Sequence, residues 1–155
     1  MPPTPYAAFV AGVEAEEAGE RARAEAFFRH ALRLDPRLAA AWTNLGNLRL
    51  AEGSRGDARE AYEKALALDP DQPEARYNLA NLLYELGQTD LALAEYRRVV
   101  TAAPDFADAH YNLGVCLLEI GAGVQARSHL RRYLELEPDS EFADLARGWL
   151  VGSSA

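Results

Sequence analysis

The sequence contains little of what strands, disulfides and membrane spans require. Val, Ile and Thr together number 12 of the 155 residues, which disfavours a β-rich fold because strands are enriched in β-branched residues. The one cysteine excludes a disulfide framework, an iron–sulfur cluster and a zinc site built from several thiolates. No apolar run approaches the ~18 residues of a membrane-spanning helix. The N-terminal stretch has no basic residue before its short apolar segment and does not resemble a signal peptide, so we expect a soluble, cytoplasmic protein.

The abundant residues favour helices and a protein partner. The chain has 30 Ala and 22 Leu, two residues with high helix propensity. Its formal net charge is −8, which makes the polyanions DNA and RNA unfavourable partners. With 15 Arg and 1 Lys beside the many alanines, the composition indicates a GC-rich bacterial genome.

Four series of residues recur every 34 positions. They are Pro36, Pro70, Pro104 and Pro138; Gly19, Gly53, Gly87 and Gly121; Ala24, Ala58, Ala92 and Ala126; and Phe28, Tyr62, Tyr96 and Leu130. Such internal periodicity predicts a repeat architecture in which neighbouring units bury each other's faces. The units are 5–38, 39–72, 73–106 and 107–140, with 1–4 before them and 141–155 after them.

Each unit is predicted to contain two helices. In unit 39–72, apolar residues at helical spacing end at Gly53, a residue that readily adopts the left-handed conformation that stops a helix. The second half is helical until Asp69, because the residue before a proline is disfavoured in helical geometry. Thr4 followed by Pro5 predicts an N-cap and a first helical position.

This pattern resembles the tetratricopeptide repeat (TPR) family over nearly the whole chain. We count positions within a unit from Pro5, Ala39, Pro73 and Ala107. The residues of unit 39–72 that match the family motif are Trp42, Leu45, Gly46, Ala58, Tyr62, Ala65 and Pro70. The first unit matches least well in its first helix, where Ala8, Ala11 and Ala15 stand at three positions of large residues, and Arg76 and His110 depart at position 4 of the last two units. The resemblance implies an all-α fold, an α-α superhelix (TPR solenoid) of helix-turn-helix repeats.

The end of such a stack needs a cover, and the C-terminal residues predict one. Residues 141–151 place Phe142, Leu145, Trp149 and Leu150 on one stripe, which is typical of an amphipathic capping helix. With it the chain would have about nine helices. Residues 152–155 are expected to form a disordered tail.

Residues that carry catalysis or bind metals are few and dispersed. Cys116 lies among leucines and predicts a buried structural thiol. His110 and His129 lie on the two helices of one unit, but two histidines without a further ligand make a weak metal site. The glycines fall at turns and packing positions rather than in a phosphate-binding loop. We therefore predict no enzyme, no cofactor and no metal site.

In the TPR family, positions 2, 5, 6, 9, 12 and 13 of the first helices face a concave groove. The resemblance thus implies a partner-binding groove of Asn44, Asn47, Asn78, Asn81, Asn112, Tyr77, Tyr84, Tyr111, Glu74, Glu85, Asp108 and Glu119. Glu16 and Glu17 also fall at these positions, whereas no Lys or Arg does. A carboxylate clamp is therefore not predicted, and the expected ligand is neutral or basic.

The recurrence of Asn44, Asn78 and Asn112 has two interpretations. Because an Asn side chain both donates and accepts, a ladder of them could hold an extended peptide backbone. This arrangement is similar to the asparagine ladder of the O-linked N-acetylglucosamine transferases. Alternatively, Asn at this position supports the turn or the packing of neighbouring repeats.

The sequence therefore predicts a non-enzymatic protein–protein interaction module or scaffold. Its acidic concave groove would bind a basic or neutral peptide segment of a partner protein. The alternative is a self-assembling scaffold that organises a multiprotein complex through its repeat ends, which would make the protein a homo-oligomer.

Overall fold

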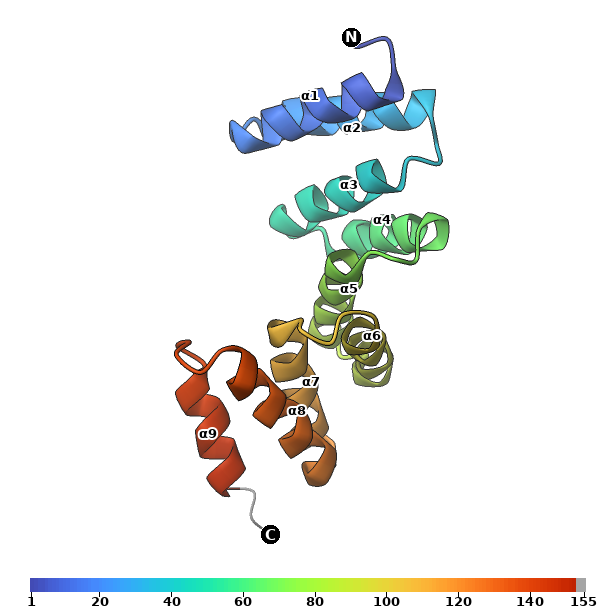
Figure 1. The fold of residues 1–155 in the computed structure, drawn as a ribbon. Helices are drawn as coiled ribbons and strands as arrows, with labels where there is room; N and C mark the ends of the chain where they lie inside the picture. Colours follow the sequence, from blue (N-terminus) through green and yellow to red (C-terminus); the bar gives the residue numbers. More distant parts are fainter. Residues whose placement is uncertain (153–155) are drawn as a thin grey trace. The chain divides into compact units, whose positions relative to one another are not determined.

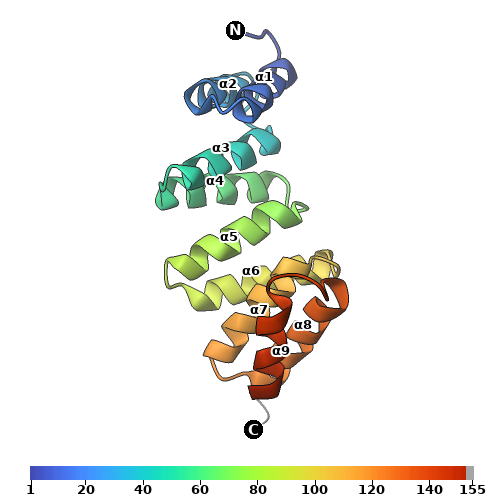
Figure 2. The ribbon, with the colours of Figure 1, turned by 90° about the vertical axis from the view of Figure 1, so that its left-hand side faces the viewer.

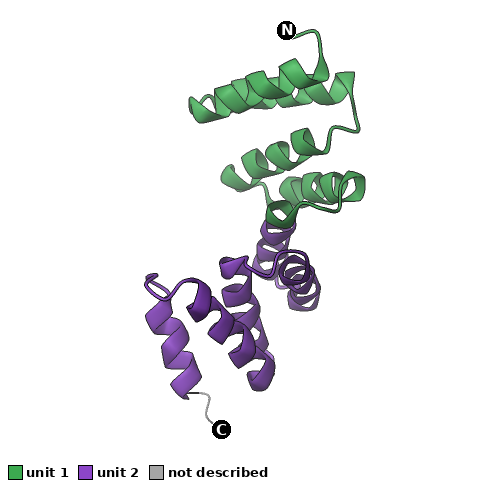
Figure 3. Cartoon of the chain, in the orientation of Figure 1, with its two compact units in different colours: residues 1–75 green, residues 76–155 purple. Residues whose placement is uncertain are grey.

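A computed structural model describes residues 1–152, and these residues form nine α-helices and no strands (Figure 1). The helices are α1 (Pro5–Glu17), α2 (Arg21–Leu34), α3 (Ala39–Ala51), α4 (Arg55–Leu68), α5 (Pro73–Glu85), α6 (Thr89–Ala102), α7 (Ala107–Glu119), α8 (Gly123–Leu136) and α9 (Ala143–Gly152). They fall into two compact units, Met1–Ala75 and Arg76–Ala155, of which the second is described to residue 152 (Figure 3). No helix in the described part of the chain is long and apolar enough to cross a membrane.

The predicted glycine turns are confirmed. Gly53 has φ +81°, and the backbone N–H of the next residue, Ser54, donates to the carbonyl of Arg49 at 2.9 Å. Gly19, Gly87 and Gly121 have φ values between +77° and +82°. L-residues other than glycine rarely adopt this left-handed conformation, so the 34-residue glycine series fixes where each first helix ends.

In three of the four helix pairs, a glycine of the first helix faces a large residue of the second. In α3, a Cβ atom added to Gly46 would lie 2.9 Å from the ring of Tyr62, which is fully buried. The same relation holds between Gly12 and Phe28, where the distance would be 2.5 Å. The absent side chain at position 8 therefore allows the two helices to approach closely enough to bury the large residue at position 24.

Unit 1 contains two such helix pairs, α1 with α2 and α3 with α4 (Figure 2). The predicted N-cap at the start of α1 is present: the Oγ1 of Thr4 accepts a hydrogen bond from the backbone N–H of Ala7 at 3.1 Å. The pairs are joined through Ala8, Ala31 and Ala41, which are fully buried in one cluster with Leu45. Small residues at this joint let neighbouring pairs pack closely.

Unit 2 ends in α9, which packs on α8. The cap predicted over residues 141–151 corresponds to Ala143–Gly152, and the remainder of the expected tail, 153–155, lies outside the described residues. Its buried face contains Ala143 and Ala146. Leu145, which the sequence placed on the buried stripe, is instead 53% exposed. Ala146 lies in one buried cluster with Leu130 and Tyr133 of α8, and the large Trp149 packs against this cluster.

The Gly46–Tyr62 contact makes a stability prediction. Gly46→Ala should lower the free energy of unfolding by about 1–2 kcal/mol, because overpacking against the ring outweighs the helix propensity gained by alanine. Thermal unfolding followed by circular dichroism measures the change. Gly56→Ala is the matched control, since nothing lies within 4 Å of its added Cβ, and it should not destabilise. Equal destabilisation by both variants would contradict the packing explanation.

Candidate functional site

The candidate site lies on the first helices of unit 2. Its surface, which we call the α5/α7 surface, consists of Tyr77, Asn78, Asn81, Tyr84, Glu85, Asp108, Tyr111, Asn112, Val115 and Glu119. A pocket of about 340 Å³ opens on this surface. Its lining residues are Asn81, Tyr84, Glu85, Tyr96, Asn112, Val115 and Cys116. Four of the predicted groove residues, Asn81, Tyr84, Glu85 and Asn112, therefore meet at one pocket.

Two of the predicted asparagines form a hydrogen-bond network within the wall of this pocket. The Oδ1 of Asn81 accepts from the hydroxyl of Tyr96 and from the Nδ2 of Asn112, the latter at 3.0 Å. The same Nδ2 donates to the hydroxyl of Tyr77 at 2.9 Å. Burial raises the pKa of both Tyr77 and Tyr96 above the ordinary value, so their hydroxyls remain protonated.

This network bears on the two interpretations of the asparagine series. It joins α5, α6 and α7, so Asn112 takes part in the packing of neighbouring repeats. In unit 1, the Oδ1 of Asn47 likewise accepts from the hydroxyl of Tyr62 on α4. Asn44 makes no side-chain hydrogen bond within residues 1–152, and it lies half-buried on α3. The packing role is thus visible for Asn112, while peptide binding by the series stays a prediction.

A second hydrogen bond connects the two first helices of unit 2. The hydroxyl of Tyr84 on α5 donates to the Oε1 of Glu119 on α7. This hydrogen bond to the carboxylate, followed by burial, raises the pKa of Tyr84 to about 12, so the phenol keeps its proton at physiological pH. The Glu119 carboxylate therefore lies beside Tyr84, a residue of the pocket wall, and Glu85 and Asp108 are exposed on the same surface.

Tyr111 lies in a different environment from the other groove tyrosines. Its ring centroid is 5.1 Å from that of Tyr133, 5.4 Å from that of Phe142 and 5.8 Å from that of Trp149. These rings belong to α8, to the loop before α9, and to α9 itself. Tyr111 therefore helps to hold the capping helix and is a weak candidate for a partner contact. The sequence pattern could not show this because the cap lies outside the 34-residue register.

The remaining predicted residue of the groove, Glu74, lies in unit 1 on the first turn of α5. Its side chain is exposed. Beside it, the Oγ1 of Thr43 donates to Gln72, so position 5 of α3 is also engaged in local contacts. Glu74 is available at the surface of unit 1 but is not part of the pocket on unit 2.

Sequence reasoning missed Cys116 and Tyr96 as residues of the pocket wall. Cys116 is 2% exposed, and burial followed by the charge of Glu119 raises the pKa of its thiol to about 11. A thiol with this pKa is almost wholly protonated at neutral pH and is a poor nucleophile. The sequence could have indicated that Cys116 lines the pocket, because this residue directly follows Val115, which holds groove position 9.

His110 and His129 are in direct contact, as the sequence allowed. Their Nδ1 atoms are 3.1 Å apart, their rings stack at 5.3 Å, and the Nε2 of His110 donates to the carbonyl of Pro104 at 2.8 Å. Between residues 1 and 152, no cluster of three or more His, Cys, Asp or Glu side chains could hold a metal ion. The pair occupies positions 4 and 23, where the preceding repeat has an ion pair between Arg76 and Glu95 at 2.6 Å.

Comparison with known proteins identifies the family. A model described as tetratricopeptide repeat matches residues 9–73, 43–105 and 77–141. The chain belongs to the tetratricopeptide repeat family. Its members are protein-interaction modules, and the all-α TPR repeat fold predicted from the sequence is confirmed. No curated protein matches the chain significantly in sequence.

Several solved TPR structures share the fold. A tetratricopeptide repeat protein from Parabacteroides merdae ATCC 43184 has a TM-score of 0.84 at 24% identity, covering 96% of this chain and 59% of that one. YrrB, described as a TPR protein with an unusual peptide-binding site, has a TM-score of 0.80 at 24% identity, with coverages of 95% and 84%. A MamA chain from Desulfovibrio magneticus RS-1 has a TM-score of 0.81 at 19% identity, with coverages of 99% and 91%.

The histidine pair of this TPR chain predicts a pH dependence of stability. Burial, followed by the charges of His110 and Arg97, lowers the pKa of His129. The folded state therefore binds a proton less readily than the unfolded state, so stability should fall as the pH drops below the unfolded value of about 6.5. Thermal midpoints measured between about pH 7.5 and about pH 5 should decline more steeply in the wild type than in His129→Gln. Parallel pH profiles for the two proteins would refute this assignment.

Proposed function

We propose that the protein is a non-enzymatic interaction module whose α5/α7 surface binds a basic or neutral peptide segment of a partner protein. The observation that carries the proposal is a pocket with amide-bearing walls on a surface that has three carboxylates: Glu85 lines the pocket, and Asp108 and Glu119 lie elsewhere on the α5/α7 surface. No Lys or Arg belongs to this surface; Arg76 on α5 is half-buried and paired with Glu95.

The chemistry of the surface suits a cationic segment of extended or helical peptide. The carboxylates would attract Lys and Arg side chains, while the pocket accepts a smaller apolar or polar side chain between Tyr84 and Val115. Amide side chains at the wall offer partners to a peptide backbone whatever its sequence. That the TPR relative YrrB is described as having a peptide-binding site supports this proposal.

The same residues argue against catalysis. The thiol of Cys116 stays protonated, and the hydroxyl of Tyr84 is already engaged with Glu119. An acyl-transfer or metal-assisted reaction needs a nucleophile, a base and a charge-stabilising group that converge, and these residues do not supply that set. We therefore assign the surface to recognition, in the cytoplasm of a bacterial cell as the composition suggests.

The proposal predicts salt-sensitive binding of basic peptides. An Arg/Lys-rich peptide should bind with a dissociation constant on the order of micromolar at low salt and more weakly at high salt, because the Debye length shortens. Glu85→Lys combined with Asp108→Lys should weaken binding about tenfold or more, because two attractive charges become repulsive. Isothermal titration calorimetry at two ionic strengths measures both effects.

The control for this experiment changes the same charges elsewhere on unit 2. Asp90→Lys combined with Asp139→Lys replaces exposed acids on α6 and on the loop after α8, neither of which belongs to the α5/α7 surface. This variant should bind the peptide nearly as well as the wild type. Binding that ignores salt, or that falls equally in both double variants, would defeat the electrostatic part of the proposal.

The alternative function, a self-assembling scaffold, is favoured by the surfaces of the first and last helices. In unit 1, the edge formed by α1 and α2 has a small pocket of about 140 Å³ beside Ala11, Ala15 and Phe27. In unit 2, α9 exposes Leu145 and Val151. If these ends join copies of the chain, light scattering after size-exclusion chromatography should show mass increasing with concentration. A monomeric mass at every concentration would remove this alternative.

A further inference from the structure

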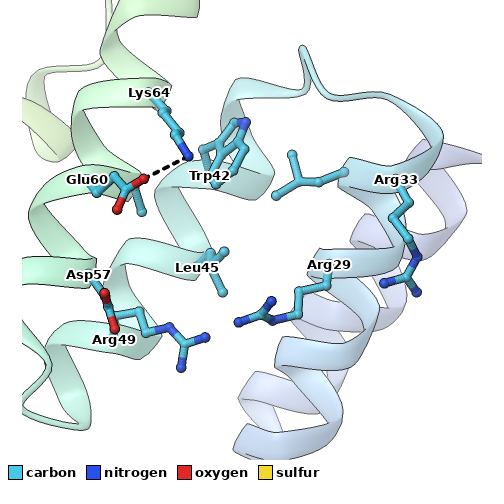
Figure 4. A pocket seen from close by; sticks show the side chains of 10 residues that line it. Arg29, Arg33, Trp42, Leu45, Arg49, Asp57, Glu60 and Lys64 are labelled. Carbon is cyan, nitrogen blue, oxygen red and sulfur yellow. Dashed lines mark ion pairs between the residues drawn. The ribbon is translucent and has the colours of Figure 1, made fainter.

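Another pocket of unit 1 lies between α2, α3 and α4 (Figure 4). It has a volume of about 480 Å³, within the usual range for binding sites. Its walls are Arg29, Leu32 and Arg33 of α2, Trp42, Leu45 and Arg49 of α3, and Asp57, Glu60, Ala61 and Lys64 of α4. On α3, the lining residues are roughly half a turn away from Asn44 and Asn47.

The cavity exists because of what fills positions 4 and 23 in this repeat. In the two later repeats these positions are bridged, by the ion pair of Arg76 with Glu95 and by the contact of His110 with His129. Here they hold Trp42 and Ala61, and the alanine side chain is too short to reach across the space. Leu32, Leu45 and Ala61 form a floor that is nearly buried, so the pocket is apolar at its base.

The rim of the pocket has four cations, Arg29, Arg33, Arg49 and Lys64, and two carboxylates, Asp57 and Glu60. Arg29 projects toward the cavity from α2, and Arg49 lies at its lower edge (Figure 4). Glu25 accepts from both, from the Nε of Arg29 at 2.7 Å and from a terminal nitrogen of Arg49 at 2.6 Å. Although burial acts in the opposite direction, these two arginines lower the pKa of Glu25. Arg49 also pairs with Glu52 at 3.1 Å, so two carboxylates serve these two guanidinium groups.

Arg33 and Lys64 add further positive charge at opposite edges. Arg33 is exposed one turn after Arg29, and no carboxylate lies within ion-pair distance of it among residues 1–152. Lys64 pairs with Glu60 at 3.1 Å and sits 4.5 Å above the ring of Trp42 (Figure 4). The indole Nε1 of Trp42 donates to the carbonyl of Pro36, which fixes the ring as one wall.

We propose that this pocket is a second binding site, for an acidic peptide segment of a partner protein that carries one bulky apolar residue. The apolar side chain enters between Trp42 and Leu45, and the flanking carboxylates pair with Arg33 and Arg29 on the α2 side. The site selects the charge opposite to that selected by the α5/α7 surface.

The test uses two blocked synthetic peptides and nuclear magnetic resonance of the tryptophan indoles. In the acidic peptide, one phenylalanine is flanked on both sides by Asp and Glu; in the matched peptide, Lys replaces each acid. The acidic peptide should shift the Nε1–H signal of Trp42 and leave that of Trp149, which lies in unit 2, unchanged. Its affinity should decrease with salt.

Two variants link the binding to the pocket. Arg33→Glu changes an exposed side chain and should weaken the binding of the acidic peptide about tenfold. Arg131→Glu on α8 should leave this affinity unchanged. Ala61→Phe fills the cavity and should abolish the Trp42 shift; circular dichroism checks that it folds. The proposal is overturned if the acidic peptide binds no better than the lysine peptide, or if Arg33→Glu leaves its affinity unchanged. If only the lysine peptide fails to bind, the result contradicts the proposal for the α5/α7 surface and leaves the proposal for this pocket supported.

Discussion

The structure depends on the close contact between position 8 of each first helix and position 24 of the second. Gly46 against Tyr62 is the clearest case, because even one methyl group would meet the ring. Burying an aromatic side chain of this size is worth roughly 1.5–3 kcal/mol, which a single short helix could not otherwise obtain. The same approach carries the phenol hydroxyl past the first helix, where it reaches the Oδ1 of Asn47. Packing on one side of the helix therefore fixes a polar group on the other.

This connection explains why the α5/α7 surface has rigid polar walls. Tyr96 is buried by the same packing as Tyr62, and its hydroxyl holds Asn81, which in turn accepts from Asn112 of the next repeat. The amides are thus placed by a chain of contacts that begins in the apolar core. A preorganised amide loses less conformational entropy when it binds a ligand than a free side chain would. In this way a hydrogen bond within the stack and a contact with a partner can belong to the same residue series.

The 34-residue register predicted most of the fold and only part of the site. The glycine turns at Gly53 and its equivalents, and the cap at Thr4, follow from local conformational preferences and could be read from the sequence. The surroundings of Tyr111 could not, because α9 follows no repeat rule and covers its ring. Nor could the register show the pocket beside Trp42, since that pocket depends on how far the side chains at positions 4 and 23 reach toward each other.

Positions 4 and 23 show how one repeat scaffold acquires different surfaces without changing its backbone. An ion pair at Arg76 and Glu95, half-buried and 2.6 Å long, satisfies both charges locally and closes the space between the helices. The contact of His110 with His129 closes it with two stacked rings, and burial lowers the pKa of His129. Trp42 with Ala61 leaves the space open and surrounds it with guanidinium groups. Since these positions lie on the opposite side of the first helix from the asparagines, they can vary without disturbing the amide network. The two sides of a repeat can therefore differ in shape and charge independently of each other.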